Sequence, residues 1–420
     1  MSLPLAPAVD AAAVIADLRE LARLTGDARG AQRLCWGPGW RAARDFLGSR
    51  LAQLGAEMEV EVDEAGNLHA RLPGADRHAP ALALGSHLDS VPDGGWLDGA
   101  LGVMGALGVL RAWAEHGSPP PRDLVLIDFA DEEGARFGRS LFGSSAIAGT
   151  LDPAELATLT DGEGRGLADV LAENGVELST VPAAGSRLAG IGAYLELHIE
   201  QGPVLEARGA SCAAVFGCAG VERHVLSFSG QASHAGTTPM NLRRDAGLAA
   251  AEAALAVERV ALAHGGVGTC GRVSLSPGVV TAVAGRAELA VDLRHPEAEP
   301  LADMISEALA AAATIADERR CVFGGEPIWR IEPITFDPGL VAVAERACEA
   351  PGGIDAAIAS GALHDAAEMA RHVPVAMIFC ASLEGISHDS SEDSSESDLT
   401  AAIEAFGELA GEALAGMPSS

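Results

Sequence analysis

The chain contains no lysine, so arginine supplies every basic residue, and acids far outnumber bases. Lysine and arginine together number 28 against 59 aspartates and glutamates, which gives a formal net charge of −31. This balance argues against binding to nucleic acid or to an anionic membrane surface, because both carry negative charge themselves. A high-GC coding bias accounts for the arginine-only basic set. A halophilic host is an alternative explanation of the acidity.

Long apolar runs and paired cysteines are also missing. No stretch reaches the uninterrupted apolar length that spans a bilayer. The first 20 residues lack the basic start and apolar run of a signal peptide. The seven cysteines include no pair with CxxC spacing. We therefore expect reduced, buried thiols in a cytoplasmic protein.

The segments that are present are typical of a large α/β protein. The 420 residues, 48% of them hydrophobic, exceed what one ordinary core holds and do not fit disorder. Helical patterns at 11–24 and 99–116 alternate with strand patterns at 80–85, 123–130 and 192–197, and a further strand is expected at 373–380. This alternation predicts an α/β domain with a central, mostly parallel sheet.

Residues 217–330 have a different pattern. We expect strands at 222–229, 268–274 and 286–294 and one that begins at 320, with helices at 243–264 and 301–316. The resulting β-α-β-β-α-β order is that of a ferredoxin-like α+β unit. We therefore predict a catalytic domain built from 1–216 and 331–420, with an inserted domain at 217–330. The low-complexity run at 389–398, DSSEDSSESD, is expected to be a solvated loop.

Metal-binding side chains follow the predicted strands of the first domain. Because ligands of α/β sheets gather at the carboxyl ends of strands, we expect these residues to converge. Histidines and carboxylates can hold a pair of divalent cations, which activate water for attack on carbonyl or phosphoryl centres. In chain order they are His87, Asp89, Asp98, Glu132, Glu133, His198 and His388.

The residues alone leave several roles open. Adjacent side chains diverge, so one of Glu132 and Glu133 can bind metal while the other acts as a general base, although an exposed acidic loop is an alternative. On spacing alone, a single histidine such as His198 or His388 is more often a structural or surface residue than a metal ligand. His234, in a rigid turn, can donate to an oxyanion or make only a local bond. Arg294 can clamp a substrate carboxylate or form a surface salt bridge.

Six motifs together resemble the amidase/hydantoinase/carbamoylase family, which belongs with the aminoacylase-like dinuclear metallopeptidases. They are GSHLDSVPDGGWLDGALGV, DEEGARFG, LHIEQGPVLE, GQASHAGTTPMNLRRDA, SGALHDA and GISHDSSE, and they span nearly the whole chain. LHIEQGP and SHAGTTPM are specific to this branch. The family contains N-carbamoyl-L-amino-acid hydrolases, allantoate amidohydrolases and β-ureidopropionases.

The resemblance implies a dinuclear metal centre. Its ligands would be His87, Asp98, Glu133, His198 and His388, with Asp98 bridging two divalent ions. Glu133 and His388 would complete the shell of one ion, and the remaining two histidines that of the other. Zinc, manganese, cobalt and nickel all suit such ligands, because no thiolate is among them.

The resemblance also implies roles for other residues. Glu132 matches the general base, while Gln201, His234 and Arg294 match positions that contact substrate. Asp89, two residues after the first ligand, is expected to orient that ligand's ring from behind. Members of the family are homodimers that associate through the small domain, and the histidine matching His234 reaches the active site of the partner subunit.

Three positions depart from the family pattern. Thr281 stands where an asparagine is usual, Leu363 where a glycine is common, and Asp389 begins a Asp-Ser pair that replaces Ser-Pro. None removes a ligand or the base. The resemblance therefore implies a hydrolase of a linear ureido C–N bond, in an N-carbamoyl-L-amino acid or allantoate, that releases ammonia and carbon dioxide. An aminoacylase or dipeptidase, and a non-catalytic metal-binding dimer, are the alternatives.

Overall fold

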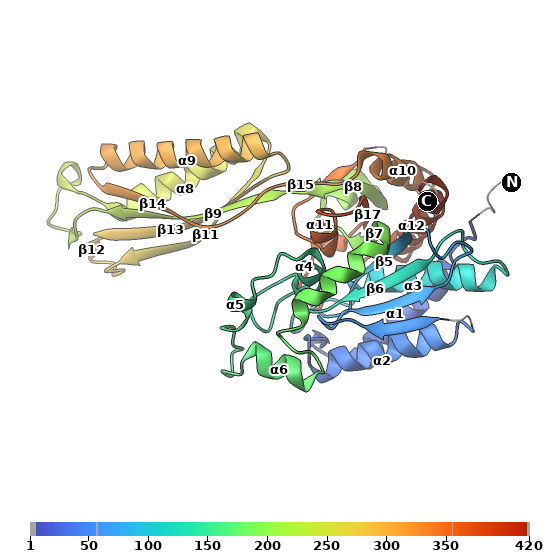
Figure 1. Ribbon diagram of the computed structural model, residues 1–420. Coiled ribbons are helices and arrows are strands. Elements are labelled where there is room, and N and C mark those ends of the chain that lie inside the picture. The colour runs from blue at the N-terminus through green and yellow to red at the C-terminus, as the bar shows by residue number, and fades with distance from the viewer. Residues whose placement is uncertain (1–5, 56–57, 355, 418–420) are drawn as a thin grey trace. The chain divides into compact units, whose positions relative to one another are not determined.

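A computed structural model describes residues 6–55, 58–354 and 356–417 (Figure 1). The chain divides into two compact units. The first comprises the chain up to Phe216, Thr335–Ile358 and the residues from Leu363 onward, and the second comprises Gly217–Ile334 with Ala359–Ala362. Among the described residues, no helix is both long enough and apolar enough to cross a membrane.

The first unit is built on a nine-stranded sheet in the order β15-β8-β17-β7-β5-β6-β4-β3, with β16 beside β8. The neighbours β17, β7, β5 and β6 run parallel, whereas β8, β4 and β3 pair antiparallel. The predicted α/β class is confirmed, and the sheet is mixed because it contains both parallel and antiparallel pairs. The strand bounds are β3 (Glu59–Val62), β4 (Leu68–Leu72), β5 (Ala81–His87), β6 (Leu124–Phe129), β7 (Ile191–Ile199), β8 (Cys212–Cys218), β15 (Ile334–Thr335), β16 (Ile358–Ser360) and β17 (Val375–Cys380).

Two groups of helices pack on this sheet. Helix α3 (Ala100–Glu115) contacts β5, β6 and β7 and also packs on α1 (Ala11–Thr25) and α12 (Glu396–Gly416). Helix α10 (Pro338–Glu349) joins α12, and α2 (Pro38–Ala52) joins α1. The second group contacts β6, β7 and β17 and consists of α4 (Phe142–Ala148), α11 (Asp365–Met369) and η1 (Val181–Gly190). Short elements complete the unit: β1 (Gly26–Asp27), β2 (Gly30–Ala31), α5 (Pro153–Leu156), α6 (Leu167–Glu173), α7 (Val204–Arg208) and η3 (Leu383–Gly385).

The second unit has the ferredoxin-like order of elements. Its four strands form an antiparallel sheet in the order β11-β13-β9-β14, and α8 and α9 pack on it. Helix α8 begins three residues later than the pattern predicts, because Asp245 caps its first turn. The bounds are β9 (Gly220–Ser229), β10 (Ser233–His234), η2 (Met240–Leu242), α8 (Ala246–His264), β11 (Val267–Ser276), β12 (Ala282–Val283), β13 (Arg286–His295), α9 (Ala298–Glu318) and β14 (Val322–Ile331).

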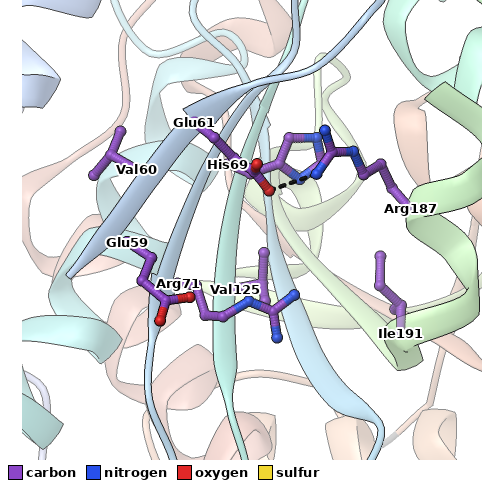
Figure 2. A pocket seen from close by; sticks show the side chains of 8 residues that line it. All are labelled: Glu59, Val60, Glu61, His69, Arg71, Val125, Arg187 and Ile191. Carbon is purple, nitrogen blue, oxygen red and sulfur yellow. Dashed lines mark hydrogen bonds and ion pairs between the residues drawn. The ribbon is translucent and has the colours of Figure 1, made fainter. Parts of the chain in front are cut away.

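A polar pocket of about 280 Å³ lies in the first unit between the β3–β4 hairpin and η1 (Figure 2). Its two arginines are already paired, since Arg187 Nη1 lies 2.6 Å from Glu61 and Arg71 Nη1 lies 2.7 Å from Asp123. Val125, near the start of β6, is part of the lining. The pocket therefore lies toward the amino end of that strand, whereas the predicted metal ligands follow the carboxyl ends.

Candidate metal centre

The candidate ligands lie where the parallel strands end. His87 is the last residue of β5, His198 is next to last in β7, and both were expected just beyond these strands. The acids at 132 and 133 follow β6, the aspartate at 98 precedes α3, and the histidine at 388 follows β17. Because β17, β7, β5 and β6 are parallel neighbours, their carboxyl ends meet at one edge and bring these side chains together.

Asp98 connects two groups of candidate ligands. Its Oδ1 lies 3.7 Å from His87 Nε2 and 3.2 Å from His198 Nε2. Its Oδ2 lies 3.3 Å from His388 Nε2, which is itself 3.5 Å from Glu133 Oε2. Within each of these two groups of three residues, the potential ligand atoms lie within 4.8 Å of one another. One carboxylate is thus shared, one oxygen facing each group.

The imidazole rings are held from behind by the backbone. His87 Nδ1 lies 3.1 Å from the carbonyl oxygen of Asp89, and His198 Nδ1 lies 2.9 Å from that of Ile199. A donating Nδ1–H leaves Nε2 of each ring as the atom available to a cation. The carboxylate of Asp89, expected to orient the ring, lies 3.6 Å from Nδ1. It also accepts the backbone N–H groups of Glu132 and Glu133 and so shapes the acidic turn. A role for Asp89 in orienting the ring remains a prediction.

Glu132 lies beside the first group and belongs to neither. Its Oε2 is 3.6 Å from His87 Nε2, and its side chain is largely buried. The chain turns at Asp131, two residues after the end of β6, where a φ of 56° lies in the left-handed region. Glu133, which follows Glu132 in the chain, belongs to the second group. The two adjacent glutamates therefore occupy different places, as a base beside a metal pair requires.

The electrostatics of the site reflect crowding of buried acids and imidazoles. Burial raises the pKa of Glu132 well above its usual value, and burial with the Asp98 charge raises the pKa of Glu133 to about 7. Burial would lower the pKa of His87, but the surrounding carboxylates, chiefly Glu132, raise it well above its usual value. Divalent cations offset such carboxylate crowding. The donor set of imidazoles and carboxylates therefore fits a pair of them.

Gln201 lies at the same edge of the sheet. Its side-chain Nε2 donates to Asp98 Oδ2 at 2.9 Å and to Ser387 Oγ at 3.1 Å. Asp389 follows the last candidate ligand and is exposed, and Leu363 is half-buried before His364. The side chain of Gln201 thus contacts the carboxylate that the two groups share.

The other two predicted substrate contacts belong to the second unit. His234, in β10, is exposed, and its Nδ1 accepts the N–H of Gly236 at 3.1 Å. Thr281 lies beside it, since its carbonyl oxygen accepts the N–H of Ala235. Arg294, in β13, pairs with Asp292 through Nε at 2.8 Å and donates from Nη1 to the carbonyl of Gly361 at 2.6 Å. Roles in substrate binding remain predictions for these residues.

Three buried residues near the site were not singled out from the sequence. The ring of His364 lies 4.4 Å from that of His198, centroid to centroid, and burial lowers its pKa. Arg33, fully buried, donates from Nε to the carbonyl of Leu88 at 2.7 Å. Glu392 is buried beside the Asp98 turn. The SGALHDA motif could have revealed His364 and the GISHDSSE motif Glu392, whereas Arg33 carries no local signal.

Gly99 determines where the ring of His87 can lie. Its φ of 63° already disfavours a side chain, and a β-carbon there would lie 2.4 Å from the ring. We expect Gly99→Ala to displace His87 and weaken metal binding, measured by competition with a chromophoric chelator. Gly117→Ala is the matched control, because Gly117 has a φ of 79° and open space around it. Equal metal binding in the two variants would contradict this account.

Comparison with known proteins identifies the family. Residues 83–412 match Peptidase family M20/M25/M40. The chain is 38% identical over 377 residues to an N-carbamoyl-L-amino acid amidohydrolase of Geobacillus stearothermophilus, covering 89% of this chain and 91% of the relative. It is 33% identical to an allantoate amidohydrolase of Escherichia coli, covering 90% and 91% respectively. A crystal structure of an amidase of the hydantoinase/carbamoylase family from Burkholderia multivorans superposes with a TM-score of 0.88 at 31% identity, covering 96% and 98%.

The chain therefore belongs to Peptidase family M20/M25/M40, whose members depend on a pair of metal ions. Within that family it groups with the hydantoinase/carbamoylase amidases, as the motifs of the sequence indicated. The matches extend over both units of the structure, because each covers most of the chain.

Proposed function

We propose that the protein hydrolyses the linear ureido C–N bond of an N-carbamoyl-L-amino acid or of allantoate. The observation that carries this proposal is the carboxylate of Asp98, which faces two ligand groups, with Glu132 beside the first of them. The named activities of the relatives support the choice of a ureido substrate. The reaction is the cleavage of a C–N bond that is not a peptide bond.

The two groups would each hold one divalent cation. His87, Asp98 and His198 would form one site, and Asp98, Glu133 and His388 the other. Zinc or manganese would suit these donors, and cobalt or nickel would also be accepted. When bound, such a pair supplies polarisation of the ureido carbonyl and lowers the pKa of water at the site.

The residues of the chain supply positioning and proton transfer. Glu132 takes a proton from the attacking water as the new C–O bond forms, and passes it to the substituted nitrogen as the C–N bond breaks. The carbamate so released separates into ammonia and carbon dioxide. Arg294 holds the carboxylate of the substrate through a two-pronged contact, and Gln201 binds its polar groups. His234 donates to the developing oxyanion.

An ammonia assay on purified, metal-loaded protein tests this function. We expect release from allantoate or from at least one N-carbamoyl-L-amino acid, compared with N-carbamoyl-β-alanine and an N-acetyl amino acid. Cleavage of only the N-acetyl compound or of dipeptides, without ammonia, would replace the proposal with an aminoacylase or dipeptidase. Bound metal without turnover of any substrate would leave a non-catalytic metal-binding protein.

We also propose a cytoplasmic homodimer that associates through the second unit. Exposed apolar side chains lie on α8 and on β11, one of the two edge strands of its sheet, and an uncovered edge of this kind favours pairing with a second copy. They include Leu255, Leu262, Val267 and Val273. All seven cysteines are free thiols, which supports a reducing compartment. The oligomeric state is measured by light scattering, in which the double variant Leu255→Glu/Leu262→Glu is compared with the unmodified protein.

Subunit mixing tests whether His234 acts in the partner's site. We expect His234→Ala and Glu132→Gln each to be inactive alone, and partial activity to return when the two are unfolded together and refolded as mixed dimers. One of the two sites in a mixed dimer then combines an intact Glu132 with an intact His234. If the histidine served its own subunit instead, each site would lack one group and mixing would restore nothing.

A further inference from the structure

Glu392 lies inside the run that the sequence predicts to be a solvated loop. That expectation is wrong at this position, since the side chain is 1% exposed. Its Oε1 accepts the backbone N–H groups of Leu97 at 3.2 Å and Asp98 at 3.1 Å. Its Oε2 accepts the hydroxyl of Ser387 at 2.9 Å. A buried carboxylate with three donors is firmly held, because hydrogen bonds to a charged acceptor are stronger than neutral ones.

These contacts join two segments that are far apart in the sequence. Leu97 and Asp98 form the turn that opens α3, and this turn presents the carboxylate shared by both ligand groups. Ser387 directly precedes His388, a ligand of the second group only. Through one carboxylate, Glu392 therefore fixes the separation between the Asp98 turn and the His388 loop.

The surroundings are shaped for this carboxylate. A β-carbon on Gly95 would lie 2.0 Å from Glu392 Cδ, so only glycine lets the turn approach so closely. The neighbouring Asp393 reinforces the same junction, since its Oδ1 accepts the indole N–H of Trp96 at 3.2 Å. Both acids of this pair thus bond to the turn at 95–98.

The two ligand groups depend on this junction to different degrees. His87 and His198 sit on the buried strands β5 and β7, and the backbone holds their rings. The side chain of His388 is 52% exposed, on a loop with a left-handed φ of 58°. Its loop is restrained at Ser387, through Glu392 and Gln201. Loss of Glu392 would therefore loosen the second group first.

We propose that Glu392 is a positioning residue for the metal centre, which sets the affinity of the group formed by Asp98, Glu133 and His388. It acts through the backbone of Asp98 and through Ser387. The inference rests on the proposed metal centre and does not depend on which substrate is cleaved.

Metal binding of Glu392→Ala tests the proposal. Stoichiometry is measured by plasma mass spectrometry and affinity by zinc competition with a chromophoric chelator. We expect one ion per subunit to remain bound and the other to bind about 10–100-fold more weakly, as is typical when an outer partner of a metal ligand is lost. Retention of both ions with unchanged affinity, or equal loss of both, would overturn the assignment.

Three further variants sharpen the result. Glu392→Gln keeps an acceptor for the two backbone N–H groups and is expected to bind zinc nearly as the unmodified protein does. Ser387→Ala removes the hydroxyl that bonds to Glu392 and to Gln201, and it leaves the bonds of Glu392 to the Asp98 turn in place. It should therefore weaken the same ion, and it carries the test if Glu392→Ala fails to fold by circular dichroism. Glu396→Ala removes an exposed acid four residues away that bonds to Arg19, and should change nothing. The metal-binding measurement needs no substrate. A failure of the ureido assay would therefore not affect the test of Glu392.

Discussion

Glu132→Gln is expected to lower kcat by about 10²–10⁴-fold while both metal ions stay bound. The amide cannot take a proton from water or return it to the leaving nitrogen, yet it is close in size to the carboxylate it replaces. Glu132 lies outside both ligand groups, so metal content should not change. Steady-state ammonia release and plasma mass spectrometry of the same preparation measure the two effects.

The neighbouring residue provides the matched control. Glu133 belongs to a ligand group, so Glu133→Gln is expected to reduce metal occupancy together with activity. The two variants differ by one position and make the same chemical change. A Glu132→Gln protein with the unmodified rate, or one that loses metal as Glu133→Gln does, would remove the distinction between base and ligand.

Asp98→Asn is expected to empty the metal centre. Its two carboxylate oxygens face different groups, and an amide offers only one neutral acceptor oxygen in their place. We expect weakening beyond the roughly 100-fold that loss of an outer partner costs, for both ions. Plasma mass spectrometry after dialysis measures occupancy, and thermal unfolding with and without added zinc measures the stabilisation that bound metal provides.

Asp93→Asn is the control for this variant. Asp93 lies in the same glycine-rich turn, with a half-exposed side chain that accepts from Gln32 at 2.7 Å. Asparagine tolerates its φ of 57°. Zinc should stabilise Asp93→Asn as it does the unmodified protein. An Asp98→Asn variant that retained both ions would show that the shared carboxylate is not a ligand.

The sequence predicts much of this architecture because local patterns carry it. The apolar segments that became β5, β6 and α3 were identified with small errors at their ends, and the acids beyond β6 were predicted to lie at a strand end. The antiparallel strands at the sheet edges were not predicted. Strand β3 alternates glutamate with valine, but it has only four residues and is exposed throughout, so its pattern is too short to mark a strand by itself.

The site was predictable only in part for a similar reason. His198 and His388 are single histidines whose neighbours say little about distant partners, so the resemblance was needed to assign them. Glu392 lies in an acidic, serine-rich run, and its burial depends on contacts with residues nearly three hundred positions earlier. The order of residues within such a segment cannot reveal which distant turn will pack against it and bury one of its side chains.

If each group holds an ion, as we propose, sharing Asp98 would make their occupancies interdependent. If an ion in one group changes the affinity of the other by some factor, the second ion must change the affinity of the first by the same factor. A titration of this protein with metal is then described by two intrinsic binding constants and one coupling constant. When the supply of metal falls, loss of an ion from one group should change the affinity of the other group for its ion.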